Sequence, residues 1–180
     1  MTFSQKMTQL PTAPAAMNHE GVTIVFSRKT DSDEARGFVP GYHFKIINNL
    51  SEEVGHLNFR VGDTDHVRLA AGHIGFKITE QHRGHRYAAN ACLAAAHWIS
   101  EVSGTVIITV DPDNLPSIRT IERIGATFID EVDVPEGDPH YLRGSLRKKR
   151  YHWRPTKREQ GSAHQPATRL ESSFPRNHNP

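Results

Sequence analysis

The chain has 180 residues, enough for one domain with additional segments at its ends. Its 22 Lys and Arg residues nearly balance 20 Asp and Glu residues, so the composition excludes a polycation that coats nucleic acid. No apolar run reaches the roughly 18 residues of a membrane-spanning helix, the 12 histidines show no paired ligand spacing, and Cys92 is the single cysteine. We therefore expect a cytoplasmic protein with no disulfide framework, membrane span or metal site.

Both ends of the chain differ in composition from its middle. Residues 1–20 and 156–180 are polar, contain several prolines and show no apolar periodicity. Such segments bury too little apolar surface to offset the entropy lost on ordering. We therefore predict disorder in residues 1–20 and in the tail 156–180, with one folded domain in residues 21–155.

The first half of this domain has the pattern of strands. Short runs that are β-branched or alternate between apolar and polar residues predict four strands, at 22–26, 42–47, 54–61 and 73–78. The connection 27–41 is short and contains three residues that break helices, Gly37, Pro40 and Gly41. It therefore has room for one poor helix at most.

The second half mixes helical and strand patterns. Small and apolar residues recur at helical spacing over 85–102, and Gly104 marks the end of that helix. The β-branched run 105–110 predicts a buried strand, 116–124 a short helix, and 127–134 and 150–154 two further strands. The order of elements predicts a mixed α/β domain, with Cys92 in its core.

The segment 76–87 is the most informative part of the sequence. A predicted strand leads through a glycine turn at Gly84 directly into the start of the long helix. Free main-chain N–H groups and the positive end of the helix dipole then meet at one place, where Arg83 and Arg86 add full positive charges. The segment predicts a site for a diphosphate, although neither a P-loop nor a GxGxxG fingerprint is present.

Two motifs in this half resemble those of a known family. Gln81-x-x-Gly84-x-Arg86 resembles the Q/R-x-x-G-x-G/A acetyl-CoA signature of the GNAT superfamily of acyltransferases. Asp111-Pro112-Asp113-Asn114, with Ser117, Glu122 and Gly125-Ala126 after it, resembles the family's second motif. The resemblance covers about residues 54–134. Two residues depart from the pattern, because Arg86 replaces a small residue and Ile121 stands where many members carry a tyrosine acid.

The resemblance implies a fold and a co-substrate. It implies a mixed, mostly antiparallel sheet of about seven strands, with a V-shaped splay between the fourth strand, 73–78, and the fifth, 105–110. It also implies that acetyl-CoA, as co-substrate, contacts Phe76, Lys77, Ile78, Arg83, Gly84, His85, Arg86, Tyr87, Asn114 and Ser117. The short first crossover lacks the family's two helices, so we expect a differently built acceptor site.

The catalytic groups are candidates of unequal strength. His73 lies close to the position of a glutamate base in several members, and a strand-end histidine bonded to a carbonyl explains it equally well. Glu80 is the second candidate base, although its charge is well placed to pair with Arg83. Ser117 would lie near the sulfur. Tyr141 is a candidate acid, and a packed loop aromatic is the simpler explanation for it.

These expectations lead to one function and three alternatives. The resemblance implies transfer of an acetyl group to a primary amine of a small molecule or a protein N-terminus, by direct attack, and it allows a homodimer. The alternatives are an acyl-CoA-binding regulator, a ribosome or RNA partner using the basic strip 143–154, and another nucleotide-phosphate binder. We do not expect nucleic acid as the main partner. The acidic stretch 130–138 favours a cationic acceptor if it borders the acceptor pocket.

Overall fold

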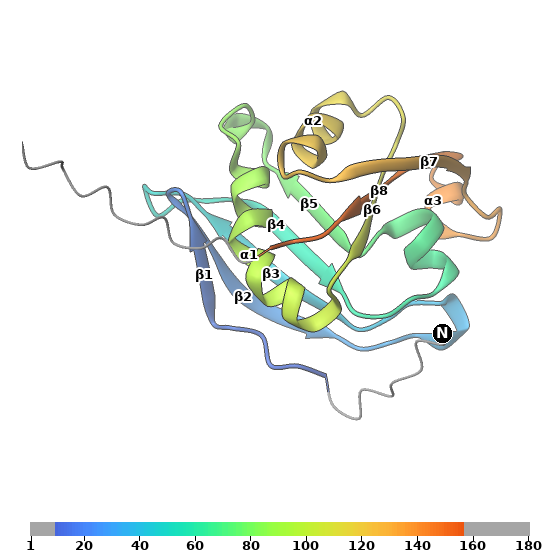
Figure 1. Cartoon of the computed structure of the whole chain (residues 1–180), viewed down its shortest axis with the longest axis horizontal. Helices are drawn as coiled ribbons and strands as arrows, with labels where there is room; N and C mark the ends of the chain where they lie inside the picture. Colours follow the sequence, from blue (N-terminus) through green and yellow to red (C-terminus); the bar gives the residue numbers. More distant parts are fainter. Residues whose placement is uncertain (1–9, 157–180) are drawn as a thin grey trace, which may run out of the picture.

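The structure, a computed structural model, describes residues 10–156. Eight strands form two antiparallel sheets, which confirms the expected mixed α/β architecture (Figure 1). The first sheet has the order β1-β2-β3-β4-β5 and contains Ala16–His19, Val22–Thr30, Gly41–Ile47, Glu53–Arg60 and Ile74–Ile78. The second has the order β6-β8-β7 and contains Val106–Val110, Arg147–Trp153 and Thr127–Asp133.

Helices and helical turns connect several of these strands. The expected long helix is α1, Tyr87–Ser103, and the expected short one is α2, Leu115–Arg123. The first crossover holds only a 3-10 turn, η1 (Glu34–Arg36), as its glycines and proline predicted. Three further elements were not predicted from the sequence: the π-helix η2 (His66–Ala71), the 3-10 turn η3 (Glu80–His82) and the four-residue helix α3 (Pro139–Leu142).

The start of the domain differs from the sequence-based expectation. Residues 16–19 were expected to be disordered, yet they form β1, which pairs with β2 along its edge. The Phe26 N–H donates to the Ala15 carbonyl at 2.9 Å, and the Tyr42 hydroxyl donates to the Pro11 carbonyl at 2.5 Å. Main-chain hydrogen bonds do not depend on apolar side chains, so composition alone gave the wrong boundary. The expected disorder of residues 1–9 and 157–180 lies outside the described residues.

The core packs α1 against the first sheet and extends to α2 and the second sheet (Figure 1). Trp98 of α1 makes edge-to-face contacts with three aromatic rings of β3 and β4, at centroid distances of 5.0, 5.7 and 5.4 Å from Tyr42, Phe44 and Phe59. Cys92 is fully buried in this layer, as predicted, and burial raises the pKa of its thiol to about 12. No helix within residues 10–156 is long and apolar enough to cross a membrane.

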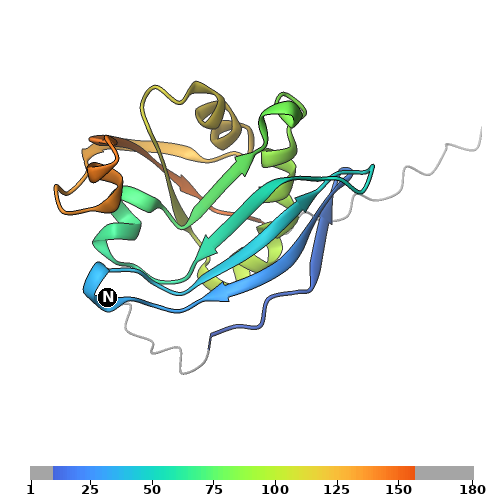
Figure 2. The same ribbon diagram turned by 180° about the vertical axis from the view of Figure 1, so that it is seen from behind.

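The two sheets meet at one point, the start of β5 and β6. The His73 N–H donates to the Ile107 carbonyl at 2.8 Å, and the Ile107 N–H donates to His73 Nδ1 at 3.0 Å. Beyond this contact the strands share no ladder and move apart, which confirms the expected V-shaped splay (Figure 2). The single seven-stranded sheet of the expectation is thus two sheets joined at an apex.

Gly72 allows η2 to approach β6 beside this apex. Its φ is +66°, and an added Cβ would lie 2.8 Å from the Thr109 nitrogen. Gly104, at the end of α1, has nearly the same φ, +65°, and nothing within 4 Å of an added Cβ. Both positions have a positive φ that strains alanine, and they differ in the crowding that an added Cβ would meet.

We predict that Gly72→Ala lowers the free energy of unfolding by about 2 kcal/mol more than Gly104→Ala does, because only the first change adds a methyl group to a crowded site. Urea denaturation of both variants measures this difference. Equal losses for the two variants would contradict the close approach at the apex.

Candidate functional site

The free edge of β5 faces the gap between the sheets. Hydrogen bonds from Arg60 N–H to the His73 carbonyl and from Thr79 N–H to the Val54 carbonyl set the alternation of the β4–β5 ladder. The main-chain groups of Phe76 and Ile78 therefore point away from β4, toward the gap. One of these main-chain groups, the Ile78 carbonyl, already accepts a hydrogen bond from Arg83 Nε at 3.4 Å.

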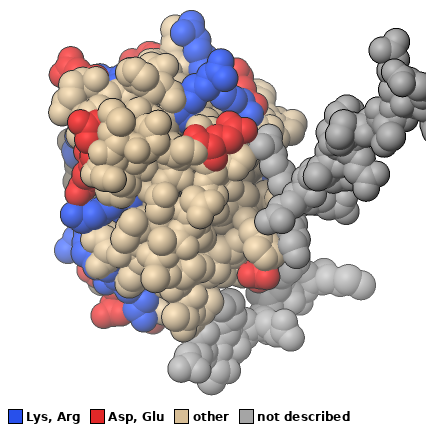
Figure 3. All heavy atoms as spheres, turned by 90° about the vertical axis from the view of Figure 1, so that its left-hand side faces the viewer, with Lys and Arg blue, Asp and Glu red and all other residues tan. Residues whose placement is uncertain are grey.

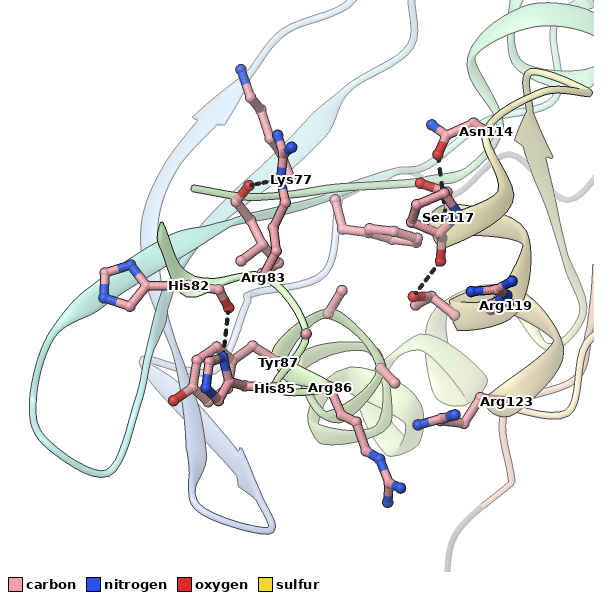
Figure 4. Close-up of a pocket in the computed structure, with 17 residues that line it drawn as sticks. Lys77, His82, Arg83, His85, Arg86, Tyr87, Asn114, Ser117, Arg119 and Arg123 are labelled. Carbon is pink, nitrogen blue, oxygen red and sulfur yellow. Dashed lines mark hydrogen bonds between the residues drawn. The ribbon is translucent and has the colours of Figure 1, made fainter. Parts of the chain in front are cut away.

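A cavity of about 690 Å³ occupies the open end of the gap (Figure 4). Its walls are the end of β5, the turn through η3, the start of α1 and one face of α2. All ten residues expected to contact acetyl-CoA line it: Phe76, Lys77, Ile78, Arg83, Gly84, His85, Arg86, Tyr87, Asn114 and Ser117. The structure thus brings the two sequence motifs to the walls of one cavity.

This cavity is positively charged. Its walls carry five full cations and no carboxylate: Lys77, Arg83, Arg86, Arg119 and Arg123. The pair on α2, Arg119 and Arg123, was missed in the sequence, although their spacing of four places both on one face of a helix. In a side view, one group of Lys and Arg side chains lies at the top of the molecule, above a broad surface with few charges (Figure 3).

The turn into α1 is shaped for an anion. Gly84 has a φ of +87° and open space where a side chain would stand. Arg86, the cap residue just before α1, has a left-handed φ of +62°, which explains why a small residue suits this position and why Arg86 is a departure. The first N–H groups of α1 have no carbonyl partner within the helix, so they are available to a ligand.

A second cavity, of about 190 Å³, continues toward the apex. Phe76, Asn114 and Ser117 line both cavities and so mark their junction. Asn114 also fixes the start of α2, because its Oδ1 accepts the Ser117 N–H at 3.2 Å. Ile121 lines the second cavity as well, so the position of the family's tyrosine carries no proton donor here.

Four ionisable side chains line the second cavity: Arg60, Asp111, His140 and Lys148. Lys148 Nζ donates to Asp111 Oδ1 at 2.7 Å, and the Ser145 hydroxyl donates to the same oxygen. Partial burial opposes ionisation of Asp111, but these hydrogen bonds and the Lys148 charge outweigh it and lower the pKa of that carboxyl. Asp111 is therefore a paired carboxylate rather than a free base.

His140 is a neutral imidazole on the cavity wall. Burial, followed by the nearby Lys148 charge, lowers the pKa of His140 to about 4. Asp138 holds the segment in place, since its Oδ1 accepts the His140 N–H at 2.7 Å and its Oδ2 lies 2.6 Å from His66 Nδ1. At neutral pH the His140 ring is therefore unprotonated, and one of its two nitrogens can accept a hydrogen bond from a ligand.

The candidate catalytic residues of the sequence analysis fare differently. Ser117 lies at the junction of the cavities, whereas His73, Glu80 and Tyr141 line neither cavity. His73 is buried at the apex, where its ring accepts the Ile107 N–H, and burial lowers its pKa. Glu80 is exposed in η3, and Tyr141 is next in sequence to His140, the residue that reaches the cavity.

The acidic stretch 130–138 and the basic strip 143–154 form ion pairs with each other across β7 and β8. Asp130 pairs with Arg150 at 2.6 Å, and Arg147 lies 3.1 Å from Glu131 and 3.4 Å from Asp133. No residue of the acidic stretch 130–138 lines the second cavity. The premise for a cationic acceptor is therefore absent, and two cations of the basic strip, Arg147 and Arg150, are held in these pairs.

Comparisons with known proteins agree with this geometry. The family model described as "Acetyltransferase (GNAT) domain" matches residues 4–127. The chain belongs to the GNAT acetyltransferase family. Among the described residues, no cluster of three or more potential metal ligands is found.

Solved structures of this family share the fold. An acetyltransferase from Agrobacterium tumefaciens aligns with a TM-score of 0.54 at 20% identity, over 81% of this chain and 97% of that one. A GNAT-family acetyltransferase from Bacillus anthracis gives 0.50 at 21% identity, over 63% and 66% of the two chains. The microcin C7 self-immunity acetyltransferase MccE, solved with acetyl-CoA and AMP, gives 0.49 at 18% identity, over 63% and 61%. This chain thus spans less than two thirds of the last two, and a search of curated proteins gave no match.

We predict that Gly84→Asp weakens the affinity for coenzyme A at least about ten-fold relative to Gly84→Asn, because the two side chains have the same size and only aspartate places a negative charge in the cationic turn. Isothermal titration calorimetry on both variants measures the ratio. Equal affinities would show that no phosphate lies at this turn.

We also predict that the His140 ring stays neutral from pH 8 down to pH 5, because its pKa is about 4. The unfolded chain takes up this proton near pH 6.5, so the free energy of unfolding falls as the pH drops from 6.5 toward 4. Side-chain NMR, with His140→Gln to assign the signal, follows the titration. A midpoint near 6.5 would refute the buried placement.

Proposed function

We propose that this protein transfers the acetyl group of acetyl-CoA to a primary amine by direct attack in a ternary complex. Family membership supports acetyltransferase activity. The proposed transfer to an amine in a ternary complex rests on one observation: two joined cavities open where β5 and β6 part, and one of them is cationic while the other holds a neutral imidazole. The first cavity suits a polyanionic carrier, and the second suits its reaction partner.

The residues of the first cavity fit coenzyme A. Five cations without a carboxylate, beside the free N–H groups of α1, suit a diphosphate and a further phosphate. The free edge of β5 at Phe76 and Ile78 suits the amide-containing arm, which pairs with it like an added strand. The thioester then lies at the junction marked by Phe76, Asn114 and Ser117.

The second cavity supplies the groups for transfer. The amine nitrogen attacks the thioester carbonyl, its proton passes to His140, and a C–N bond forms. The main-chain N–H of Phe76, which faces the gap, stabilises the oxyanion. When the C–S bond breaks, the thiolate takes its proton from solvent, because Ile121 offers none.

A regulator that binds acyl-CoA without turnover is the second candidate function, favoured by the apolar Ile121. Thioester consumption separates the two functions, since the regulator releases no thiol. The basic strip gives less support to an RNA partner, because Arg147 and Arg150 are held in ion pairs with β7.

We predict that His140→Gln lowers kcat roughly 100-fold or more with little change in acetyl-CoA affinity, because the proton acceptor is lost while the first cavity is intact. Thiol release over a panel of primary amines, with mass spectrometry of the product, measures turnover. Tyr141→Phe is the matched control from the same short helix and keeps wild-type turnover. A loss in Tyr141→Phe with full activity in His140→Gln would reverse the assignment.

A further inference from the structure

Arg60 brings an unpaired positive charge to the second cavity. It ends β4, and its Nη1 donates to two main-chain carbonyls, those of Ala71 at 3.2 Å and Gly72 at 3.1 Å. Burial lowers the pKa of this guanidinium, and no carboxylate of residues 10–156 forms an ion pair with it. The two carbonyls orient the side chain without neutralising its charge.

The other charges of the cavity are balanced. Lys148 is buried and paired with Asp111, the one acidic residue in this lining, while His140 is neutral at physiological pH. The walls therefore hold one positive charge in excess. A buried charge without a partner is destabilising, so its presence in a cavity indicates a ligand that supplies the opposite charge.

We propose that the acceptor carries a carboxylate beside its amine, as a free amino acid does, and that the Arg60 guanidinium binds this carboxylate. The proposal deepens the proposed function and rests on it. The Ala71 and Gly72 carbonyls occupy Nη1, so the Nε–Nη2 edge of the guanidinium is the one that can match the two oxygens of a carboxylate. A carboxylate also balances one excess charge, whereas a phosphate monoester brings a charge of about −1.5 to −2.

The size of the cavity agrees with a small acceptor. Its 190 Å³ correspond to about six water molecules, at roughly 30 Å³ each, which suits an amino acid. Arg60 lines only this cavity and not the one assigned to coenzyme A. The guanidinium is therefore placed to recognise the acceptor rather than the carrier.

The test compares the twenty amino acids with their carboxamides, which differ only in the negative charge. With wild-type protein and acetyl-CoA, we expect thiol release with at least one amino acid at a KM roughly 30-fold below that of its amide. We expect Arg60→Met to raise the KM of that amino acid by the same factor, about 30-fold, and to leave the KM of the amide within about two-fold of its wild-type value. Arg36→Met, which removes an exposed arginine, is the control for the lost charge and changes neither. Arg60→Lys keeps the charge without the fork, and melting temperatures report whether each variant folds.

Three results would overturn the proposal. The first is an equal KM for acid and amide in the wild type. The second is an equal loss for both in the folded Arg60 variants. The third is an Arg60-dependent preference for succinyl-CoA over acetyl-CoA, which would place the carboxylate on the acyl chain.

If no amine releases thiol, the proposed acetyl transfer fails, and calorimetry then tests the carboxylate site separately. The same amino acids and amides are titrated into protein saturated with coenzyme A. Binding of an amino acid that weakens about 30-fold in Arg60→Met supports the site, and no binding by any of them refutes it.

Discussion

The joint between His73 and Ile107 is the contact on which the site depends. Two short hydrogen bonds tie the sheets at this point, and the buried His73 ring supplies one of the acceptors. Beyond the joint, β5 and β6 are the edge strands of two different sheets and face each other without a ladder. Unpaired strand edges invite association, and here they lie inside the molecule, where they border two cavities. His73 therefore shapes the site without lining it.

The parts of the fold that follow from local patterns could be predicted from the sequence. The β-branched run 106–110 and the alanine stripe of α1 have periods that only one kind of element satisfies. β1 could not be predicted in this way, because main-chain hydrogen bonds to β2 hold its small and polar residues. α3 is only four residues long, and its one signal was the pair Asp138-Pro139, a cap followed by a proline at the first helical position.

The two cavities differ in the same way: local sequence patterns indicate the first and not the second. The first is built from a strand, a turn and two helix starts, whose motifs are continuous in the chain, so the sequence indicated ten of its residues. The second draws Arg60 from β4, His140 from α3 and Lys148 from β8. No motif joins these three segments, because only the tertiary fold brings them together. The sequence pointed to Tyr141, whereas its neighbour His140 is the residue that lines the cavity.

Two of the three departures from the family pattern, the short first crossover and Ile121, act on the side of the site that receives the acceptor. The first crossover holds only η1, so η2 and α3 form the walls there, joined by the contact between His66 and Asp138. Asp138 is engaged by this contact and so is not a free carboxylate of the acidic stretch 130–138. Most of the other carboxylates of that stretch form ion pairs with β8. Asp111 is then the one carboxylate in the lining, and Lys148 neutralises it. With Ile121 apolar and His140 neutral, Arg60 keeps the only uncompensated charge among the residues that line this cavity, and that balance is the basis for the proposed carboxylate on the acceptor.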